Sequence, residues 1–373
     1  MIGRRVLVLA AAALALAGCD GDRENVSDRQ RAAQPPAVQP APPAARPAAP
    51  PPRESATLRA IRGRGRLNCG VHPGLSGFSF RDPRGAWRGF DVDMCRATAA
   101  AVLGEADAVA YQPLSTSARF AALQAGEVDV LWRNTSVNLS RDAQLSLDFP
   151  AISYYDGQGF LVRRALRLRS AAELGGAKVC VQRDSTAQPN VAEYFRGRGV
   201  AYEEVLVAGD EQARVSYQQE ACDAFTGDIS TLAAIRSMLN DPAAHVILPE
   251  AISKEPLGPA VRQGDDVWAD AVRWTFYAMV LAEELGVTSK NVEQMRESST
   301  NPQVRRLLGV EGGFGAMLGL PDDWAFQVIR QVGNYGEVFE RNLGAGTPLR
   351  LERGLNALWS PNRPGLMYAP PMR

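Results

Sequence analysis

The residues whose types and spacing point most directly to chemistry lie in the stretch EVDVLWRNTSVNLSRD, residues 127–142. A short strand is expected over 128–132, and a polar run that Arg141 closes follows it. Small hydrogen-bonding side chains and one fixed positive charge at the carboxyl end of a strand stand where open α/β folds bind ligands. The stretch therefore predicts half of an anion-binding pocket. The polar run consists of Arg133, Asn134, Thr135, Ser136, Asn138 and Ser140.

The same stretch also fits an ordinary strand-to-helix turn. In that interpretation Ser140 caps a helix and the Arg141 side chain is solvated. The stretch alone leaves both interpretations open, so the decision depends on the elements around it.

Strand and helix segments alternate in two series along the chain, which predicts an α/β fold with largely parallel sheets and helices on both faces. Two extended segments join the series, so we expect two lobes with a hinge. Roughly 317 of the 373 residues follow Ala56, more than one hydrophobic core usually covers. The expected strands are 67–71, 109–112, 128–132, 154–162, 178–182, 203–207, 223–226, 245–248 and 256–262. The expected helices are 91–103, 115–124, 186–196, 210–220 and 230–239, and the chain is expected to be helical from 268 onward.

The first residues have the composition of a targeting segment. Arg4 and Arg5 precede an apolar run too short to span a bilayer, and LAGC ends the segment at Cys19. This resembles a bacterial lipoprotein lipobox, which implies cleavage before Cys19 and acylation of that cysteine. Asp20 resembles an inner-membrane retention signal, so we expect a periplasmic protein that is lipid-anchored to the inner membrane. The alternative is ordinary secretory cleavage with an incidental cysteine.

Residues 20–56 are expected to be a stiff spacer. Proline fills about half of the positions over 35–52, and it fixes φ and lacks a backbone donor. The whole chain has a formal net charge of zero with no basic stripe, which argues against nucleic acid as a partner.

The four cysteines after Cys19 predict disulfides, because an even number is typical of exported chains. Four cysteines allow three pairings. Cys69 and Cys95 lie on the first strand and first helix, and Cys180 and Cys222 lie in the second series, so we favour 69 with 95 and 180 with 222.

The two histidines, His72 and His245, limit the enzymatic chemistry that the sequence supports. Neither lies in a recognisable motif with a nucleophile. No CxxC pair suggests a zinc site, no Walker A loop occurs, and the glycines over 309–319 do not follow a strand in the dinucleotide pattern. We therefore expect no catalytic residues, no metal and no cofactor.

Several longer runs resemble a known family over residues 57–373. The resemblance is to the general L-amino-acid-binding proteins of bacterial ABC importers, within the type II periplasmic binding protein superfamily. It implies a monomer with a central cleft that delivers an L-amino acid to an inner-membrane permease. It also implies that 57–155 with 257–373 form lobe one and 156–256 form lobe two. The matching runs are GFDVDMCRA, LQAGEVDVLWRNTS, SRDAQLSLDF, YYDGQGF, VILPEAISKEPLGPAVRQGDD, RRLLGVEG and QVGNYGEVFERNLGAGTPL.

The resemblance also implies how an α-amino acid is held at both of its charged groups. Arg141 matches the arginine that binds the ligand α-carboxylate in this superfamily, and Ser136 and Asn134 are placed to assist it. Thr186, with Ser185, matches hydroxyl and helix-start groups of lobe two that also meet the carboxylate.

Asp228 matches the acid that binds the ligand α-ammonium, although an aspartate after a strand also fits a helix cap. We expect Phe78, His72 and Trp132 on the pocket wall, with core packing as the alternative for Phe78 and a solvated turn for His72. If Trp132 faces the cleft, it would reduce the space for a ligand side chain.

The chain departs from the family pattern in and around this site, which puts the breadth of its specificity in doubt. Asp184 would bring a negative charge near the ligand carboxylate, and Arg183 could offset it. Two other interpretations remain open: a receptor that presents its ligand to a membrane sensor, and an enzyme resembling cyclohexadienyl dehydratases, which use the same fold. The departures are at Trp132, Asn138, Arg183, Asp184, Gly227 and Ile229.

Overall fold

Strands from two separate series in the sequence join into one hydrogen-bonded path in the computed structural model, which describes residues 55–360 and 362–373. The predicted signal segment, Cys19 and most of the spacer lie outside the described residues. The strands are β1 Leu67–Val71, β2 Phe80–Arg81, β3 Trp87–Arg88, β4 Val109–Pro113, β5 Val130–Ser136, β6 Leu147–Asp148, β7 Tyr154–Arg163, β8 Lys178–Gln182, β9 Glu203–Val207, β10 Ala224–Asp228, β11 His245–Ile247, β12 Lys254–Arg262, β13 Trp359–Ser360 and β14 Arg363–Pro364.

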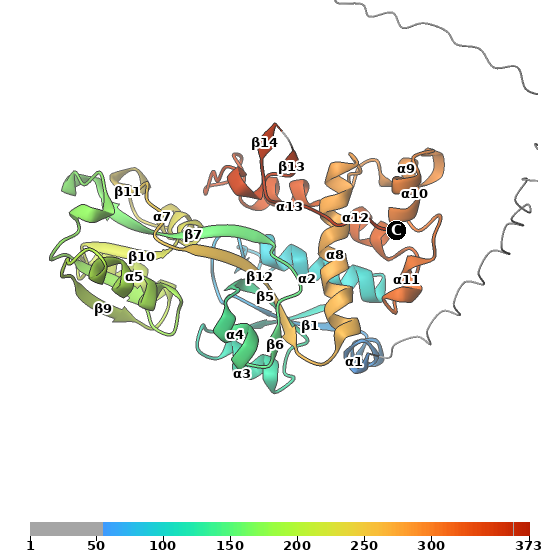
Figure 1. The fold of residues 1–373 in the computed structure, drawn as a ribbon, viewed down its shortest axis with the longest axis horizontal. Coiled ribbons are helices and arrows are strands. Elements are labelled where there is room, and N and C mark those ends of the chain that lie inside the picture. Colours follow the sequence, from blue (N-terminus) through green and yellow to red (C-terminus); the bar gives the residue numbers. More distant parts are fainter. Residues whose placement is uncertain (1–54, 361) are drawn as a thin grey trace, which may run out of the picture. The chain divides into compact units, whose positions relative to one another are not determined.

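An α-helix directly follows half of these strands, namely β3, β4, β5, β8, β9, β10 and β12 (Figure 1). The helices are α1 Ala56–Arg64, α2 Phe90–Leu103, α3 Arg119–Gln124, α4 Leu139–Gln144, α5 Ala187–Arg196, α6 Asp210–Gln218, α7 Ile229–Ser237, α8 Asp266–Glu284, α9 Val292–Ser298, α10 Pro302–Leu307, α11 Phe314–Met317, α12 Trp324–Gln331 and α13 Tyr335–Asn342. Short 3₁₀ turns lie at Arg164–Leu166, Ala171–Glu173, Pro242–Ala244 and Gly354–Asn356.

The first strand series is parallel. β1 lies between β4 and β5, and β5 continues the path to β12. Helix α2 packs against β1 and ends at Gly104, whose φ of 75° is in the left-handed region that favours glycine. The predicted disulfide between Cys69 and Cys95 joins β1 to α2 and is confirmed.

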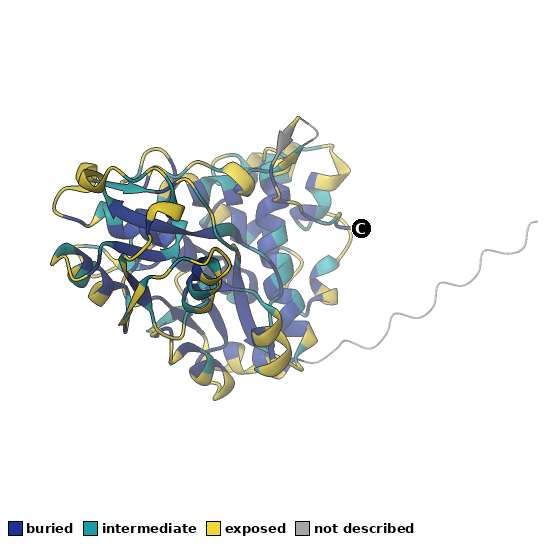
Figure 2. Ribbon diagram, turned by 60° about the vertical axis from the view of Figure 1, so that its left-hand side comes forward, coloured by how far each residue is buried: buried dark blue, intermediate teal, exposed yellow. Residues whose placement is uncertain are grey.

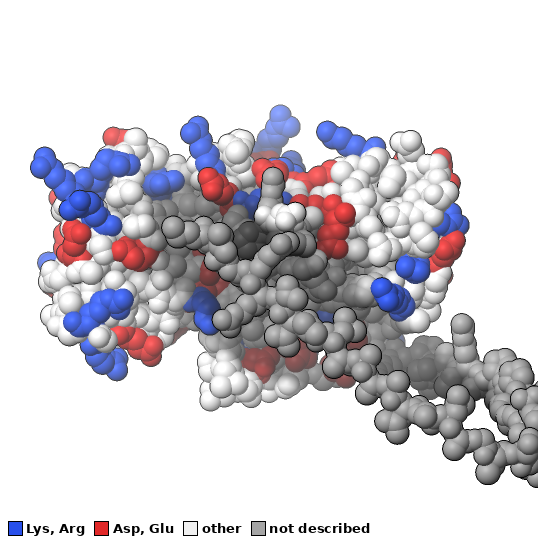
Figure 3. Space-filling view, turned by 45° about the horizontal axis from the view of Figure 1, so that its top comes forward, with Lys and Arg blue, Asp and Glu red and all other residues white. Residues whose placement is uncertain are grey.

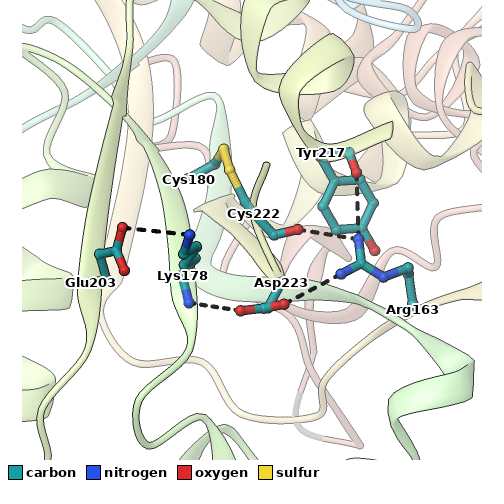
Figure 4. The surroundings of a disulfide bond; sticks show 7 residues. All are labelled: Arg163, Lys178, Cys180, Glu203, Tyr217, Cys222 and Asp223. Carbon is teal, nitrogen blue, oxygen red and sulfur yellow. Dashed lines mark hydrogen bonds and ion pairs between the residues drawn. A yellow bond between two sulfur atoms is a disulfide. The ribbon is translucent and has the colours of Figure 1, made fainter. Parts of the chain in front are cut away.

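The second series is parallel through β9, β8 and β10. Its predicted disulfide, Cys180–Cys222, is also confirmed, and Figure 4 shows its surroundings. The Arg163 guanidinium donates to the backbone carbonyl of Cys222 at 3.1 Å and lies 3.5 Å from the Asp223 carboxylate. These contacts tie the end of β7 to the segment that leads into β10.

Two long strands, β7 and β12, run side by side and link the two series (Figure 1). They pair with each other, β12 pairs with β5, and β7 pairs with β10 and β11, all antiparallel. The expectation of largely parallel sheets therefore holds within each series and is wrong for these links.

The apolar core is also divided between the two strand series. One cluster packs β1, β5 and α2 against the C-terminal helices, and includes Met94 and Phe276. Another lies in the second series around Phe160, Val181 and Phe195. Figure 2 shows the buried residues concentrated along the strands and the helices next to them.

The region after residue 268 is mainly helical as expected, although β13 and β14 add a short strand pair. Within 55–360 and 362–373, no helix is long and apolar enough to cross a bilayer. On the face drawn in Figure 3, Lys and Arg side chains are interspersed with Asp and Glu side chains.

Candidate functional site

A partly open cavity of about 50 Å³ is lined by residues from both strand series. The first series contributes the end of β1, the second half of β5 and the start of α4. The second series contributes the loop before α5, the end of β10 and the start of α6. An open space of about 330 Å³ adjoins the cavity and shares five of its lining residues.

Strand β5 is longer than predicted and delivers the polar run directly into this cavity. It extends to Ser136, and α4 then begins at Leu139. The helix cap is Asn138 instead of Ser140: the Asn138 Oδ1 atom accepts a hydrogen bond from the Arg141 backbone N–H at 2.9 Å.

Arg141 lines the cavity and is only 8% exposed, so the solvated-turn interpretation is wrong. Its Nη1 donates to the Ser136 backbone carbonyl at 2.7 Å, and its guanidinium lies over the Phe120 ring. Burial lowers the pKa of Arg141, whereas the carboxylates of Glu255 and Asp228 act in the opposite direction.

Two further arginines, Arg119 and Arg133, line the same cavity. Arg133 belongs to the polar run of the predicted half-pocket without a role of its own, and no role was predicted for Arg119. Arg133 is held within the protein: its Nε donates to the Leu114 carbonyl at 2.8 Å and its Nη2 to the Thr116 hydroxyl at 3.0 Å. Burial lowers the pKa of Arg133 to about 10. Arg119 is 4% exposed, and its Nε has no hydrogen-bond partner among the described residues.

The signal for these two arginines in the sequence is weak. Arg133 stands inside the polar run, but a single arginine, Arg141, already provides the fixed charge that a ligand carboxylate needs. Arg119 begins the short helix RFAALQ, where an arginine beside apolar residues is usually a solvated surface residue. Only the pairing of β1 with β5 and the placement of α3 bring the three arginines to one cavity.

Asp228 lies at the end of β10 and also lines the cavity. It occupies the N-cap position of α7, but its side chain makes no capping hydrogen bond. Asp156 takes that role, since its Oδ2 accepts from the Ser230 N–H at 3.2 Å. Burial and then the neighbouring carboxylates of Asp156 and Glu255 hold the pKa of Asp228 well above its usual value.

Hydroxyl groups from the two series meet at the cavity. The Ser136 and Thr186 hydroxyls lie 3.5 Å apart, and Thr186 also donates to the Glu255 carboxylate at 3.0 Å. Ser185 lines the cavity, although its hydroxyl donates to the Gln182 carbonyl of its own turn. The Asn134 side-chain carbonyl is buried at the cavity without a partner in the described part of the chain.

His72 lines the cavity and is buried, so it is not in a solvated turn. Its Nδ1 accepts from the Gly74 N–H at 3.0 Å, which leaves the proton on Nε2 to be donated to the Asp210 carboxylate at 2.9 Å. Burial and the Arg133 charge lower the pKa of His72, consistent with a neutral ring. The bond connects the residue that follows β1 of the first series to the start of α6 of the second.

Phe78 and Trp132 do not line the cavity, so their assignment to the pocket wall is wrong. Both are 1% exposed and belong to the core of the first series. Phe78 packs edge-on against aromatic rings of Phe90 and Tyr154, and the Trp132 Nε1–H donates to the Thr98 hydroxyl at 3.1 Å. Trp132 therefore takes no space from a ligand.

Two of the departures from the family pattern also lie away from the cavity. Arg183 and Asp184 are exposed and do not line it, so no extra negative charge enters the carboxylate site. The φ of Asp184 is 60°, a left-handed conformation that glycine adopts freely and aspartate tolerates. Gly227 lines the cavity, whereas Ile229 does not.

Among residues 55–360 and 362–373, no group of three or more His, Cys, Asp or Glu side chains could hold a metal ion. The cavity is lined by the guanidiniums of three arginines, by the Asp228 carboxylate with its raised pKa, and by serine and threonine hydroxyls. This combination can hold a small molecule that carries both an anionic and a cationic group.

Comparisons with known proteins agree with this chemistry. Residues 67–291 match the model of the bacterial extracellular solute-binding proteins, family 3. The glutamate/glutamine/aspartate/asparagine-binding protein BztA of Rhodobacter capsulatus is 51% identical over 86% of this chain and 94% of its own. The general L-amino acid-binding periplasmic protein AapJ of Rhizobium johnstonii is 50% identical over 86% of this chain and 93% of its own.

A solved structure covers a similar part of the chain. An ABC transporter periplasmic binding protein from Brucella ovis with glutathione bound superposes with a TM-score of 0.83 at 49% identity. The match covers 86% of this chain and 100% of that protein.

Proposed function

Because this chain belongs to the bacterial extracellular solute-binding proteins of family 3, we propose that it captures an L-α-amino acid and presents it to an ABC importer. The observation that carries the proposal is the pairing of Arg141 with Asp228 around one partly open cavity. Neither side chain forms an ion pair with another side chain in the described part of the chain. A ligand carboxylate at Arg141 and a ligand ammonium at Asp228 would supply both missing partners.

The relatives support the ligand class. BztA and AapJ are named for the amino acids that they bind, and each aligns with most of this chain. Their names describe binding proteins, and the cavity residues of this chain are arranged for holding charge rather than around a nucleophile.

We further propose that the ligand draws two lobes together. Lobe one would comprise 57–155 with 257–373, lobe two would comprise 156–256, and β7 and β12 would form the hinge. Ser136 of one series already lies 3.5 Å from Thr186 of the other, and the His72–Asp210 hydrogen bond spans the same boundary. A ligand held by Arg141 on one side and Asp228 on the other would favour this closed arrangement.

The proposed location follows from the targeting segment. Cleavage before Cys19 and acylation of that residue would tether the protein at the periplasmic face of the inner membrane, close to a permease. Metabolic labelling with a palmitate analogue tests this part, since Cys19→Ala should remove the label. Retention of the label would contradict it.

Glutathione is a second candidate ligand, because the Brucella ovis relative was solved with glutathione bound. Its γ-glutamyl group carries the same α-carboxylate and α-ammonium as a free amino acid. The open space next to the cavity offers room for the rest of the tripeptide.

Isothermal titration of the purified full chain, after refolding to remove bound ligand, tests the proposal. We expect at least one of the twenty L-amino acids or glutathione to bind with a Kd in the micromolar range or below. Arg141→Met and Asp228→Asn should each weaken binding at least tenfold, because each removes a charge-assisted contact of about 1.5–3 kcal/mol. Binding that survives both substitutions would contradict the assigned site.

A further inference from the structure

A second hollow, separate from the amino-acid cavity, is lined by arginines and by no carboxylate. It is open to solvent and measures about 560 Å³. No Asp or Glu of residues 55–360 and 362–373 lines it. We call it the arginine hollow. Its lining side chains that can donate hydrogen bonds are Arg164, Arg236, Ser237, His245, Thr347 and Arg350.

The protein itself makes little use of the guanidiniums of these arginines. Arg164 donates only through its Nε, to the Ala243 carbonyl at 3.2 Å. Within the described part of the chain, the side chains of Arg236 and Arg350 have no hydrogen-bond or ion-pair partner. The neighbouring Asp241 accepts the Ala243 N–H at 3.1 Å and caps a 3₁₀ turn instead. Three positive charges therefore line one hollow without an ion-paired carboxylate.

The backbone at Arg350 suggests that its side chain has a use. Its φ is 50°, in the left-handed region that glycine adopts freely and arginine rarely adopts. The Thr347 hydroxyl holds this turn, since it accepts the Arg350 N–H at 3.4 Å and donates to the Gly344 carbonyl at 2.9 Å. A glycine would relieve the strain at position 350, so a charged side chain there is consistent with a binding role.

The arginine hollow lies between segments of the two proposed lobes. Arg164 follows β7 and Arg236 lies in the last turn of α7, whereas Arg350 follows α13. In Figure 1, β11 and α13 lie above the crossing strands β7 and β12, and α3 and α4, which contribute to the amino-acid cavity, lie below them. The hollow and the cavity share no lining residue. They are therefore two distinct sites.

The donors of the arginine hollow match the chemistry of phosphate. Guanidiniums bind carboxylates and phosphates through a planar fork of N–H donors. A phosphate monoester offers three terminal oxygens and up to two charges, which suits several guanidiniums and hydroxyls better than one carboxylate does. The volume of about 560 Å³ lies within the usual range of small-molecule sites and exceeds that of a single phosphate.

We propose that the arginine hollow binds a polyvalent phosphate-bearing anion, which bridges the second strand series and the segment after α13. This inference goes beyond the proposed function and does not depend on it. Two sources supply the chemistry, an inorganic polyphosphate and an organic bisphosphate.

Isothermal titration of the full chain tests the inference in about 150 mM salt, where attraction between distant exposed charges is screened. The probes are pyrophosphate and tripolyphosphate for the inorganic source, and fructose 1,6-bisphosphate for the organic one. We expect at least one of them to bind with a Kd below about 1 mM. The probe that binds most tightly identifies the source. Citrate, a polyvalent carboxylate, is the comparison and should bind more weakly.

Substitution of two lining arginines assigns the binding to the hollow. Arg236→Gln combined with Arg350→Gln should raise the Kd of the tightest phosphate probe about tenfold or more, because two charge-assisted contacts are lost. Arg236→Lys with Arg350→Lys keeps the charges but loses the forks, so its Kd should be intermediate. Arg66→Gln with Arg84→Gln is the matched control, since it removes two exposed arginines that do not line the hollow.

A further variant separates the arginine hollow from the amino-acid cavity, whose own arginines also attract anions. Arg141→Met should leave the binding of the phosphate probe unchanged. Conversely, Arg236→Gln with Arg350→Gln should leave amino-acid binding and the melting temperature unchanged. If that double variant does not fold, Arg350→Gln alone takes its place, because the Arg350 side chain is exposed.

Four outcomes overturn the inference: no phosphate probe that binds with a Kd below about 1 mM, citrate that binds as tightly as the phosphates, equal phosphate binding in the double variant and its matched control, or loss of phosphate binding in Arg141→Met. A wild type that binds a phosphate probe but no amino acid or glutathione would overturn the proposed function and leave this inference standing.

Discussion

At the scale of single residues, the site depends on charges that the empty protein does not fully balance. Burial and two other carboxylates hold the Asp228 pKa well above its usual value, so the ligand-free carboxyl binds a proton more readily than an ordinary aspartate. A ligand ammonium favours the ionised form. Ligand binding is therefore coupled to the loss of a proton from this residue.

This coupling predicts that binding weakens as the pH falls. Below the raised pKa of Asp228, each ligand that binds must first displace a proton, so the apparent Kd should rise by up to tenfold per pH unit. Titrations between pH 5 and 8, in buffers of different ionisation enthalpy, measure both the Kd and the protons released. The dependence should disappear in Asp228→Asn. An identical pH profile in that variant would assign the effect to another group.

The sequence identified some site residues and not others, for physical reasons. Arg141 and Asp228 stand at or after the ends of strands and line the cavity, and the family resemblance is the source of their proposed roles. Trp132 precedes Arg133 in the same strand, yet it points into the core, because successive side chains of a strand face opposite sides. Arg119 carried no such signal, since its burial depends on contacts that span the fold.

At the scale of elements, the short helix α4 positions Arg141 through its cap. The Asn138 side chain accepts the Arg141 backbone N–H, so the cap fixes the residue that is proposed to hold the ligand carboxylate. Asn138→Ala should lower the free energy of unfolding by about 1 kcal/mol. It should also weaken ligand binding, because the first turn of α4 becomes less ordered.

Asn138→Thr is the matched control for this prediction, since a threonine hydroxyl can accept the same hydrogen bond. Urea denaturation gives the change in stability, and titration with the best ligand gives the change in Kd. If Asn138→Ala binds ligand as tightly as Asn138→Thr does, the cap does not position Arg141.

The elements themselves were predicted better than their ends. The strands 67–71 and 178–182 agree with β1 and β8 because a buried apolar segment bounded by polar residues is a clear signal. The strand 203–207 also agrees with β9, which is more exposed. The predicted strand over 128–132 ends four residues before β5 does, at Trp132 instead of Ser136, because the later residues of β5 are polar. Those residues pair with β12, and tertiary hydrogen bonding overrides the local composition.

At the scale of the whole molecule, a buried carboxylate makes stability depend on pH. Asp91 is 3% exposed at the start of α2, and its Oδ2 accepts from the Asn134 N–H at 3.0 Å. Burial raises its pKa from 3.8 to about 7. Between these values the unfolded chain has lost the Asp91 proton while the folded chain retains it, so stability falls as the pH rises through this range.

Asp91→Asn should remove this dependence and still accept the hydrogen bond from Asn134. The free energy of unfolding of the wild type, relative to the variant, should fall by up to about 4 kcal/mol between pH 4 and 8, since one pKa unit corresponds to about 1.4 kcal/mol. Urea titrations at several pH values measure the difference. Parallel profiles for the two proteins would contradict the prediction.

Hydrogen bonds between residues that are far apart in the sequence limit the order in which the molecule can fold. The Gln331 side chain of α12 accepts a hydrogen bond from the Ala106 N–H and donates one to the Gly104 carbonyl, across more than 220 residues. Strand β12, which completes the first series, likewise follows the whole second series. The strands β8, β9 and β10 of the second series can therefore pair before β12 and the C-terminal helices are available to complete the first series. Contacts this distant in sequence slow folding, so we expect β12 and the C-terminal helices to join the first series late.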